Sequence, residues 1–255
     1  MRSYVIAVLV CFTSVAVADF NRTTGLIDIP VAEVLPHGTI RGGVSISFSE
    51  ESPTSEENFT LSVGLLDRAE VSVGILSREA TEVNLLWKIL EEGSVRPAVG
   101  VGIWNIAHEE HVSDGGFGSN AYADELGYGA DRPKERLSGF CVLSKHVVPN
   151  VRFHMGVGRG RFVGWGDRSE RLRLGDRPDS AVGLFLGLDA RIIPQIQLMG
   201  ELDGRDINVG LRYSREWLDV NLAVAKLEHL MFDSEHSPRY VMGGSTYLPL
   251  WTETQ

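Results

Sequence analysis

Residues 207–214 read Ile207-Asn208-Val209-Gly210-Leu211-Arg212-Tyr213-Ser214. Large apolar residues occupy every second position, and glycine or a polar residue stands between them. Because successive side chains of a β-strand point to opposite faces, this stretch predicts a strand with one aliphatic face and one small, polar face. The same alternation recurs in residues 218–225, 182–188 and 99–103, so the chain is predicted to be all-β.

The non-aliphatic face distinguishes two kinds of sheet. A water-soluble sandwich also alternates, but its exposed face usually carries Lys, Thr and Glu. Here glycine and occasional charges dominate that face, as in Gly100, Gly102, Gly183 and Gly187. A small, polar interior with an aliphatic exterior is typical of a transmembrane antiparallel β-barrel.

Extending the pattern along the chain predicts twelve strands, an even number, as single-chain bacterial barrels require. We place them at residues 39–48, 58–65, 69–76, 81–89, 95–104, 137–146, 151–160, 180–189, 195–202, 207–213, 218–226 and 239–248.

The connections test this assignment, because such barrels alternate long outer loops with short periplasmic turns. The long connections, 49–57, 105–136, 161–179 and 227–238, all follow odd-numbered strands. The short ones, 66–68, 90–94, 147–150, 190–194 and 215–217, follow even-numbered strands. A strand assignment displaced by one would destroy this parity.

The first residues have the features of an export signal. Arg2, an apolar run over residues 4–12 and the small residues before Asp19 predict a signal peptide over residues 1–18. Residues 19–38 then form a lead-in or plug segment, and residues 39–255 the barrel. The segment 24–36, with two prolines, lies inside the barrel or along its inner rim as a gate or plug, or else is an ordered periplasmic lead-in.

Charge and cysteine content narrow the function. The net charge of −10 argues against a nucleic-acid partner, and Cys141, the one cysteine after the signal, has no internal disulfide partner. Aromatic rings are expected at the membrane interfaces. They are Phe48, Phe59 and Trp104 at the outer strand ends and Trp87, Tyr213, Trp217 and Tyr247 at the inner ends.

Alternation places nine charged or titratable side chains on the lumen face. A basic residue facing lipid at mid-depth costs about 2 to 4 kcal/mol, so these residues are candidates to line the lumen. They either pair across strands and fill the interior or form a polar pore, with Glu201 and Arg212 as one expected cross-lumen pair. The nine are Arg41, Glu70, Glu82, Arg152, His154, Asp189, Glu201, Arg212 and Asp219.

No catalytic residue, metal ligand or cofactor site is predicted. A lipid hydrolase would need a serine activated by a nearby histidine. Ser144 and His146 are two apart on one predicted strand, and His154 is on the next, but a structural role for these histidines is preferred.

Several stretches resemble the YjbH-like outer-membrane proteins associated with exopolysaccharide operons. The residues that carry the resemblance are 24–30, 34–39, 96–102, 144–145, 156–160 and 201–211. The resemblance implies an outer-membrane location and a part in polysaccharide secretion, and it supplies no catalytic residues. This chain has the length of one barrel, unlike longer members of the family.

Together these features predict an outer-membrane barrel that assists export or passage of exopolysaccharide or another polar solute. Its expected partners are outer-membrane lipid, polysaccharide and other export proteins. The alternative is a structural or adhesion protein that acts through its long outer loops, above all residues 105–136.

Overall fold

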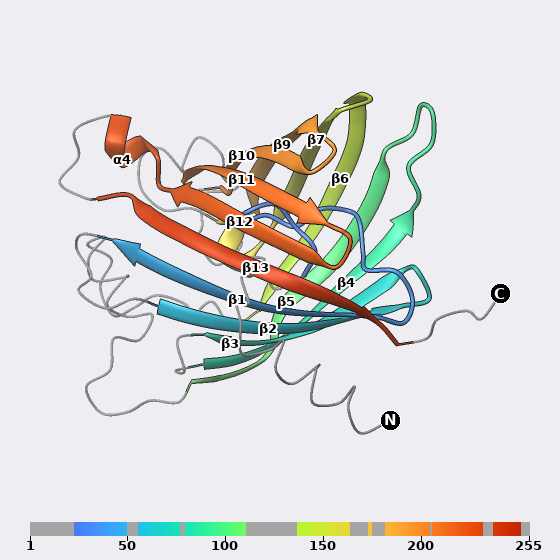
Figure 1. Cartoon of the computed structure of the whole chain (residues 1–255), viewed down its shortest axis with the longest axis horizontal. Helices are drawn as coiled ribbons and strands as arrows, with labels where there is room; N and C mark the ends of the chain where they lie inside the picture. Colours follow the sequence, from blue (N-terminus) through green and yellow to red (C-terminus); the bar gives the residue numbers. More distant parts are fainter. Residues whose placement is uncertain are drawn as a thin grey trace.

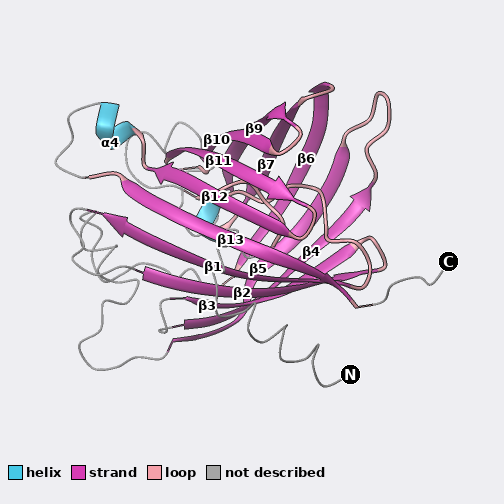
Figure 2. Ribbon diagram, viewed as in Figure 1, coloured by secondary structure: helices cyan, strands magenta, loops and turns pink. Residues whose placement is uncertain are grey.

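The computed structural model describes residues 23–49, 56–76, 80–110, 137–163, 173–174, 182–204, 206–231 and 237–250. Their main elements are strands (Figure 2). In chain order these are β1 (Thr39–Ser49), β2 (Glu56–Leu65), β3 (Ala69–Leu76), β4 (Ala80–Leu90), β5 (Ala98–Glu110), β6 (Ser138–Val148), β7 (Val151–Gly158), β8 (Arg173–Leu174), β9 (Val182–Ile193), β10 (Ile196–Leu202), β11 (Ile207–Arg215), β12 (Leu218–Ala225) and β13 (Arg239–Pro249).

The sheet closes on itself. Its order runs β10-β11-β12-β13-β1-β2-β3-β4-β5-β6-β7-β9, and β9 pairs with β10 to complete the ring. Every pairing is antiparallel, including the one in which β13 meets β1 (Figure 1). The two-residue β8 pairs with β9 outside this ring. The predicted antiparallel barrel of twelve long strands is therefore confirmed.

The fifth strand is longer than its sequence pattern predicts. β5 begins at Ala98 rather than residue 95 and continues to Glu110, whereas the pattern ends it at Trp104. The pairing of β4 with β5 shifts register between Val83 and Leu85, which is a β-bulge. Asn105 there has a φ of 60°, a left-handed conformation that asparagine tolerates, so the pattern breaks while the strand continues. Residues 111–136 of the predicted long loop lie outside the described residues.

The two faces of the wall differ in chemistry. Outward-facing aliphatic side chains remain open to the surroundings, and Leu61 and Leu222 are 57% and 48% exposed. Inward-facing polar side chains are buried, among them Ser62, Ser72, Asn84 and Asn208. Soluble proteins seldom expose an apolar surface that encircles the molecule, so this exterior suits a hydrocarbon solvent.

Two of the predicted interfacial aromatic residues face the lumen instead. Trp104 is fully buried, and its ring packs against Phe140 and Phe162 with centroids 5.0 and 5.3 Å away. Tyr247 points inward and donates a hydrogen bond to Asp219. Alternation along β5 and β13 decides the face, and it overrides the position of the ring near a strand end. Phe48, Phe59, Trp87 and Trp217 are exposed.

Helical structure is minor in the described ranges. A 3-10 turn covers Gly160–Phe162, and the short α4 covers Glu228–Met231. No helix among these residues is long and apolar enough to cross a membrane.

Candidate functional site

Residues 23–38, hereafter the plug, fold back into the barrel. The chain turns between Gly25 and Pro30, which form an isolated antiparallel bridge, and the Leu26 N–H donates to the Ile29 carbonyl over 3.1 Å. Leu26, Ile27 and Ile29 are buried in one apolar cluster with side chains of the barrel wall. The segment appears in Figure 1 as the blue loop between the strands. The buried side chains of this segment therefore pack against the inner face of the wall.

Glu201 holds the tip of the plug. Its carboxylate accepts hydrogen bonds from the backbone N–H groups of Ile27, Asp28 and Ile29 at 2.9, 2.6 and 3.4 Å. The side-chain amide of Asn208, on the neighbouring strand β11, donates to the same carboxylate at 2.8 Å. Buried backbone N–H groups need acceptors, and here the wall supplies them.

Glu70 and Arg41 hold the two ends of the plug. The Glu70 carboxylate accepts from the Thr24 N–H and hydroxyl at 2.9 and 2.6 Å and from the Leu35 N–H at 3.1 Å. Arg41 forms an ion pair with the same carboxylate at 3.0 Å, and both side chains are almost fully buried. A buried ion pair is stable only when further hydrogen bonds satisfy its charges, and Thr24 and Leu35 of the plug provide them.

The expected pair between Glu201 and Arg212 does not form. The register places Glu201 opposite Asn208 and Arg212 opposite Gln197, so the two charged side chains lie at different heights on the wall. Arg212 donates instead to the Asn221 side chain at 2.7 Å and to the carbonyls of Gly25 and Leu26 in the plug at 3.1 and 3.2 Å. Both residues face the lumen, but each binds the plug by itself.

Ser144, His154 and Asp189 form a hydrogen-bonded chain across β6, β7 and β9. The Ser144 hydroxyl lies 2.8 Å from His154 Nδ1, and His154 Nε2 lies 2.8 Å from the Asp189 carboxylate. The Ala32 N–H of the plug donates to the Ser144 oxygen at 2.9 Å. Sequence spacing pairs Ser144 with His146, but the antiparallel register places His154 directly opposite Ser144.

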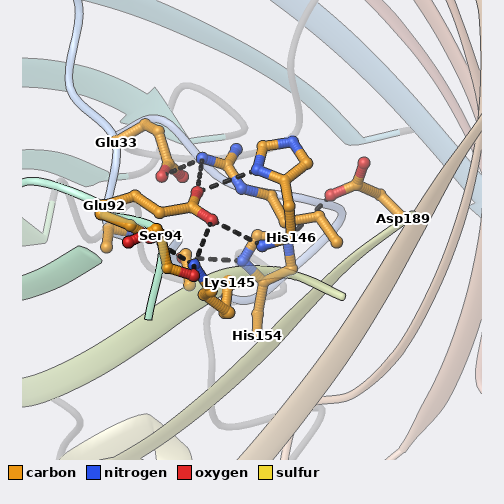
Figure 3. Close-up of polar contacts among 11 residues, drawn as sticks. Glu33, Glu92, Ser94, Lys145, His146, His154 and Asp189 are labelled. Atoms are coloured by element: carbon orange, nitrogen blue, oxygen red, sulfur yellow. Dashed lines mark hydrogen bonds and ion pairs between the residues drawn. The ribbon is translucent and has the colours of Figure 1, made fainter. Parts of the chain in front are cut away.

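A second set of polar side chains, hereafter the rim group, holds the plug at the end of the barrel that carries the short turns. Arg152 forms an ion pair with Glu33 of the plug and lies 3.9 Å from Glu92. Glu92 accepts from the His146 N–H and ring at 2.9 and 2.8 Å and pairs with Lys145 at 3.2 Å. Figure 3 shows Glu33 of the plug together with Glu92 of the β4–β5 turn and Lys145 and His146 of β6, and it also draws His154 of β7 and Asp189 of β9.

The charge of Glu92 is stabilised by this group. Partial burial acts to raise the pKa of Glu92, but the hydrogen bonds from His146 and Lys145 outweigh it and lower the pKa to about 2. Glu92 is therefore a carboxylate at neutral pH, and it ties the β4–β5 turn to β6.

The remaining two lumen candidates bind residues of the wall. Glu82 accepts from the Asn84 side chain at 3.2 Å, and Asp219 accepts from the Tyr247 hydroxyl. All nine predicted lumen residues thus lie on the inner face, and seven of them contact the plug or its anchoring side chains. Within the described ranges, no group of His, Cys, Asp or Glu has the arrangement of a metal site.

The sequence analysis did not identify the cluster of aromatic side chains inside the barrel. Trp104, Phe140 and Phe162 contact one another and Phe185 packs on Phe162, with centroid spacings of 4.7 to 5.6 Å, in the same buried cluster as the plug. A Cβ on Gly156 would collide with the ring of Phe185, one on Gly158 with the ring of Phe162, and one on Gly183 with the backbone carbonyl of Phe162. The glycine pattern of β7 and β9 was the available signal, because it marks room for large rings across the lumen.

No family model and no curated protein matches the chain. Among solved structures, the NanC porin is 13% identical with a TM-score of 0.48, over 81% of this chain and 100% of that one. The KdgM porin, solved in complex with disordered oligogalacturonate, is 8% identical with a TM-score of 0.48, over 81% and 98%. The COG4313 outer membrane channel from Pseudomonas putida F1 is 12% identical with a TM-score of 0.43, over 87% and 100%. None of these scores reaches 0.5, so the likeness does not identify what this barrel carries.

Proposed function

We propose that the protein is an outer-membrane barrel that passes a polar solute and is closed at rest by its plug. The membrane location rests on the exterior, where exposed aliphatic side chains such as Leu61, Ile75 and Leu222 encircle a sheet without free edges. Only a hydrocarbon surrounding makes such an exterior favourable, and only closed sheets satisfy their backbone groups there.

The plug's anchoring chemistry is the observation that carries the gating proposal. Besides the apolar packing of Leu26, Ile27 and Ile29, the plug is held by polar contacts that water or a solute can replace. Glu70, Glu201 and Arg212 bind its backbone, and Arg152 binds its Glu33. When the plug leaves, the same charged groups line the vacated lumen and set the field that a solute meets.

The solute is the finer part of this proposal. A lumen that carries both carboxylates and guanidinium groups suits a hydroxyl-rich polar molecule, because hydroxyls donate to Glu70 and Glu201 and accept from Arg212. The resemblance to YjbH-like proteins favours exopolysaccharide as that solute. Adhesion through the outer loops is the alternative.

Conductance in a planar lipid bilayer tests the gate. An ideal Cβ on Gly100 lies 3.1 Å from the Ala32 Cα, so a shift of a few tenths of an ångström by the plug lets the two positions form a disulfide. In a background of Cys141→Ser and Glu201→Gln, in which the weakened anchor should open the barrel, Ala32→Cys with Gly100→Cys should stay closed when oxidised and open when reduced. Equal steady currents in both states would reject the plug as the gate.

A matched pair of carboxylate variants completes the test. Glu201→Gln weakens the plug's anchor and should raise the open fraction, whereas Asp219→Asn removes a lumen carboxylate bound to Tyr247 of the wall and should leave it unchanged. If Glu201→Gln carries no current in bilayers that contain folded protein, solute passage is rejected and adhesion is favoured.

A further inference from the structure

Anchoring the one N–H group of Ala32 requires only the Ser144 oxygen, yet Ser144 is also hydrogen-bonded to His154, and His154 to Asp189. We propose that this chain of three side chains is a serine-hydrolase site that the plug masks, acting on carboxylic esters carried by polar, water-soluble molecules that enter the lumen. The proposal goes beyond passage of a solute and rests on the plug's release. It also departs from the absence of catalysis expected from the sequence.

When the His154 ring is neutral, the acceptors around it set the proton positions. The Ser144 oxygen accepts from the Ala32 N–H, so its own proton is available for His154 Nδ1 at 2.8 Å. His154 then carries its ring proton on Nε2 and donates it to Asp189 at 2.8 Å. A serine beside a base that a carboxylate orients is the arrangement that activates a hydroxyl nucleophile. The ring is used in the reverse sense from the serine proteases, in which Nε2 faces the serine.

The surroundings make the chain suited to chemistry as well as to anchoring. Ser144 and His154 are fully buried, and their three strands are adjacent in a closed sheet, which holds the side chains in register. Asp189 lies opposite Arg152 on β7, and the partner of Arg152 in the plug is Glu33. Release of the plug thus removes both the N–H that occupies the Ser144 oxygen and the carboxylate that neutralises Arg152.

The reaction follows from these positions. Ser144 Oγ bonds to the ester carbonyl carbon while its proton passes to His154 Nδ1. The bond from that carbon to the alcohol oxygen breaks, and the alcohol leaves with the proton. A water molecule, deprotonated by His154, then attacks the acyl group, which releases the carboxylic acid and restores Ser144. Asp189 stays ionised and stabilises the imidazolium in both steps.

The serine lies on the lumen face of the barrel wall, and this position determines which esters can reach it. Ser144 and His154 face the lumen, whereas membrane lipid contacts the opposite face of β6 and β7, at residues such as Met155 and Val157. An ester in the bilayer therefore cannot reach the serine. The substrate class is a polar ester small enough to share the lumen with the displaced plug.

Fluorophosphonate labelling of the refolded protein, with the labelled residue located by mass spectrometry, tests the site. Ser144 should be labelled slowly in the unaltered protein. In Glu201→Gln labelling should be roughly 30-fold faster, in step with a plug weakened by about 2 kcal/mol. His154→Ala and Asp189→Asn in that background should slow it by roughly 100-fold or more.

Ser72→Ala is the matched control, because Ser72 is an equally buried lumen serine whose hydroxyl accepts from Asn84 rather than facing a histidine. It should leave the labelling of Ser144 unchanged, and Ser144→Ala should abolish it together with hydrolysis of p-nitrophenyl acetate. Absence of labelling in a Glu201→Gln barrel that conducts would overturn the hydrolase and leave the gate intact. A barrel that neither conducts nor labels would overturn both.

Discussion

Two neighbouring stretches of the lumen wall carry the same kinds of residues but differ in what they bind. On β10 and β11, Glu201 and Arg212 direct their hydrogen bonds to the backbone of the plug. On β12 and β13, Asp219 and Tyr247 bind each other and join two strands. Glu201 and Arg212 join neighbouring strands as well, through Asn208 and Asn221, so the two stretches differ in whether their inward charges also bind the plug.

The largest effect is expected at the Glu70 anchor. Glu70→Gln leaves the Arg41 guanidinium buried without its carboxylate and should lower the free energy of unfolding by about 3 to 5 kcal/mol. Thermal unfolding in detergent, followed by circular dichroism, measures it. Asp219→Asn, which affects only a tie between strands, should cost far less, and equal losses would erase the distinction between side chains that bind the plug and those that bind only the wall.

Glu201→Gln should act on the plug rather than on the wall. An amide keeps one acceptor oxygen and replaces the other with an NH2 group, which cannot accept from the plug N–H groups, a loss of about 2 kcal/mol in plug docking. Amide hydrogen exchange at Ile27, Asp28 and Ile29 should become roughly 30-fold faster, while the amides of β12 and β13 keep their rates. A uniform increase over the whole barrel would contradict a separable plug.

Arg212→Lys sharpens the same comparison with a smaller change. Lysine keeps the charge but lacks the planar set of donors that reaches Asn221 and two plug carbonyls at once. Exchange at the plug amides should rise by roughly tenfold, the equivalent of about 1.4 kcal/mol. Unchanged exchange would show that charge alone holds this side of the plug.

The smallest effect is expected at the rim, and it depends on pH. The pKa of Glu92 is lowered to about 2, so its stabilising contribution is complete above pH of about 4.5 and is lost as the pH falls toward 2. In Glu92→Gln this acid-dependent step should disappear from a pH series of unfolding midpoints. An identical pH profile in the variant would show that the rim group adds nothing to stability.

Much of the barrel was predictable because its signal is local. The alternation in residues 207–214 is repeated in every long strand. Because the barrel has hydrocarbon outside and polar groups inside, the aliphatic face of each strand must point outward. The end of the fifth strand is predicted too early, at Trp104, because a bulge shifts the alternation without ending the strand. The nine lumen residues follow from the same rule of alternation.

The contacts inside the barrel were not predictable in the same way. Ser144 is separated by 10 residues from His154, and Ile27 by 174 from Glu201, and no local pattern links such partners. The inferred Glu201–Arg212 pair failed for this reason, since adjacent strands allow several registers.

By itself, the sequence determined which residues face outward and which inward, because each strand position has only two directions and lipid accepts just one kind of side chain. Only the tertiary structure decided that the segment before the first strand lies among the inward charges and uses them as its hydrogen-bond partners. The physical reason is that closing the ring fixes the register of all strands together, and that register alone sets the height at which each carboxylate and guanidinium meets the plug.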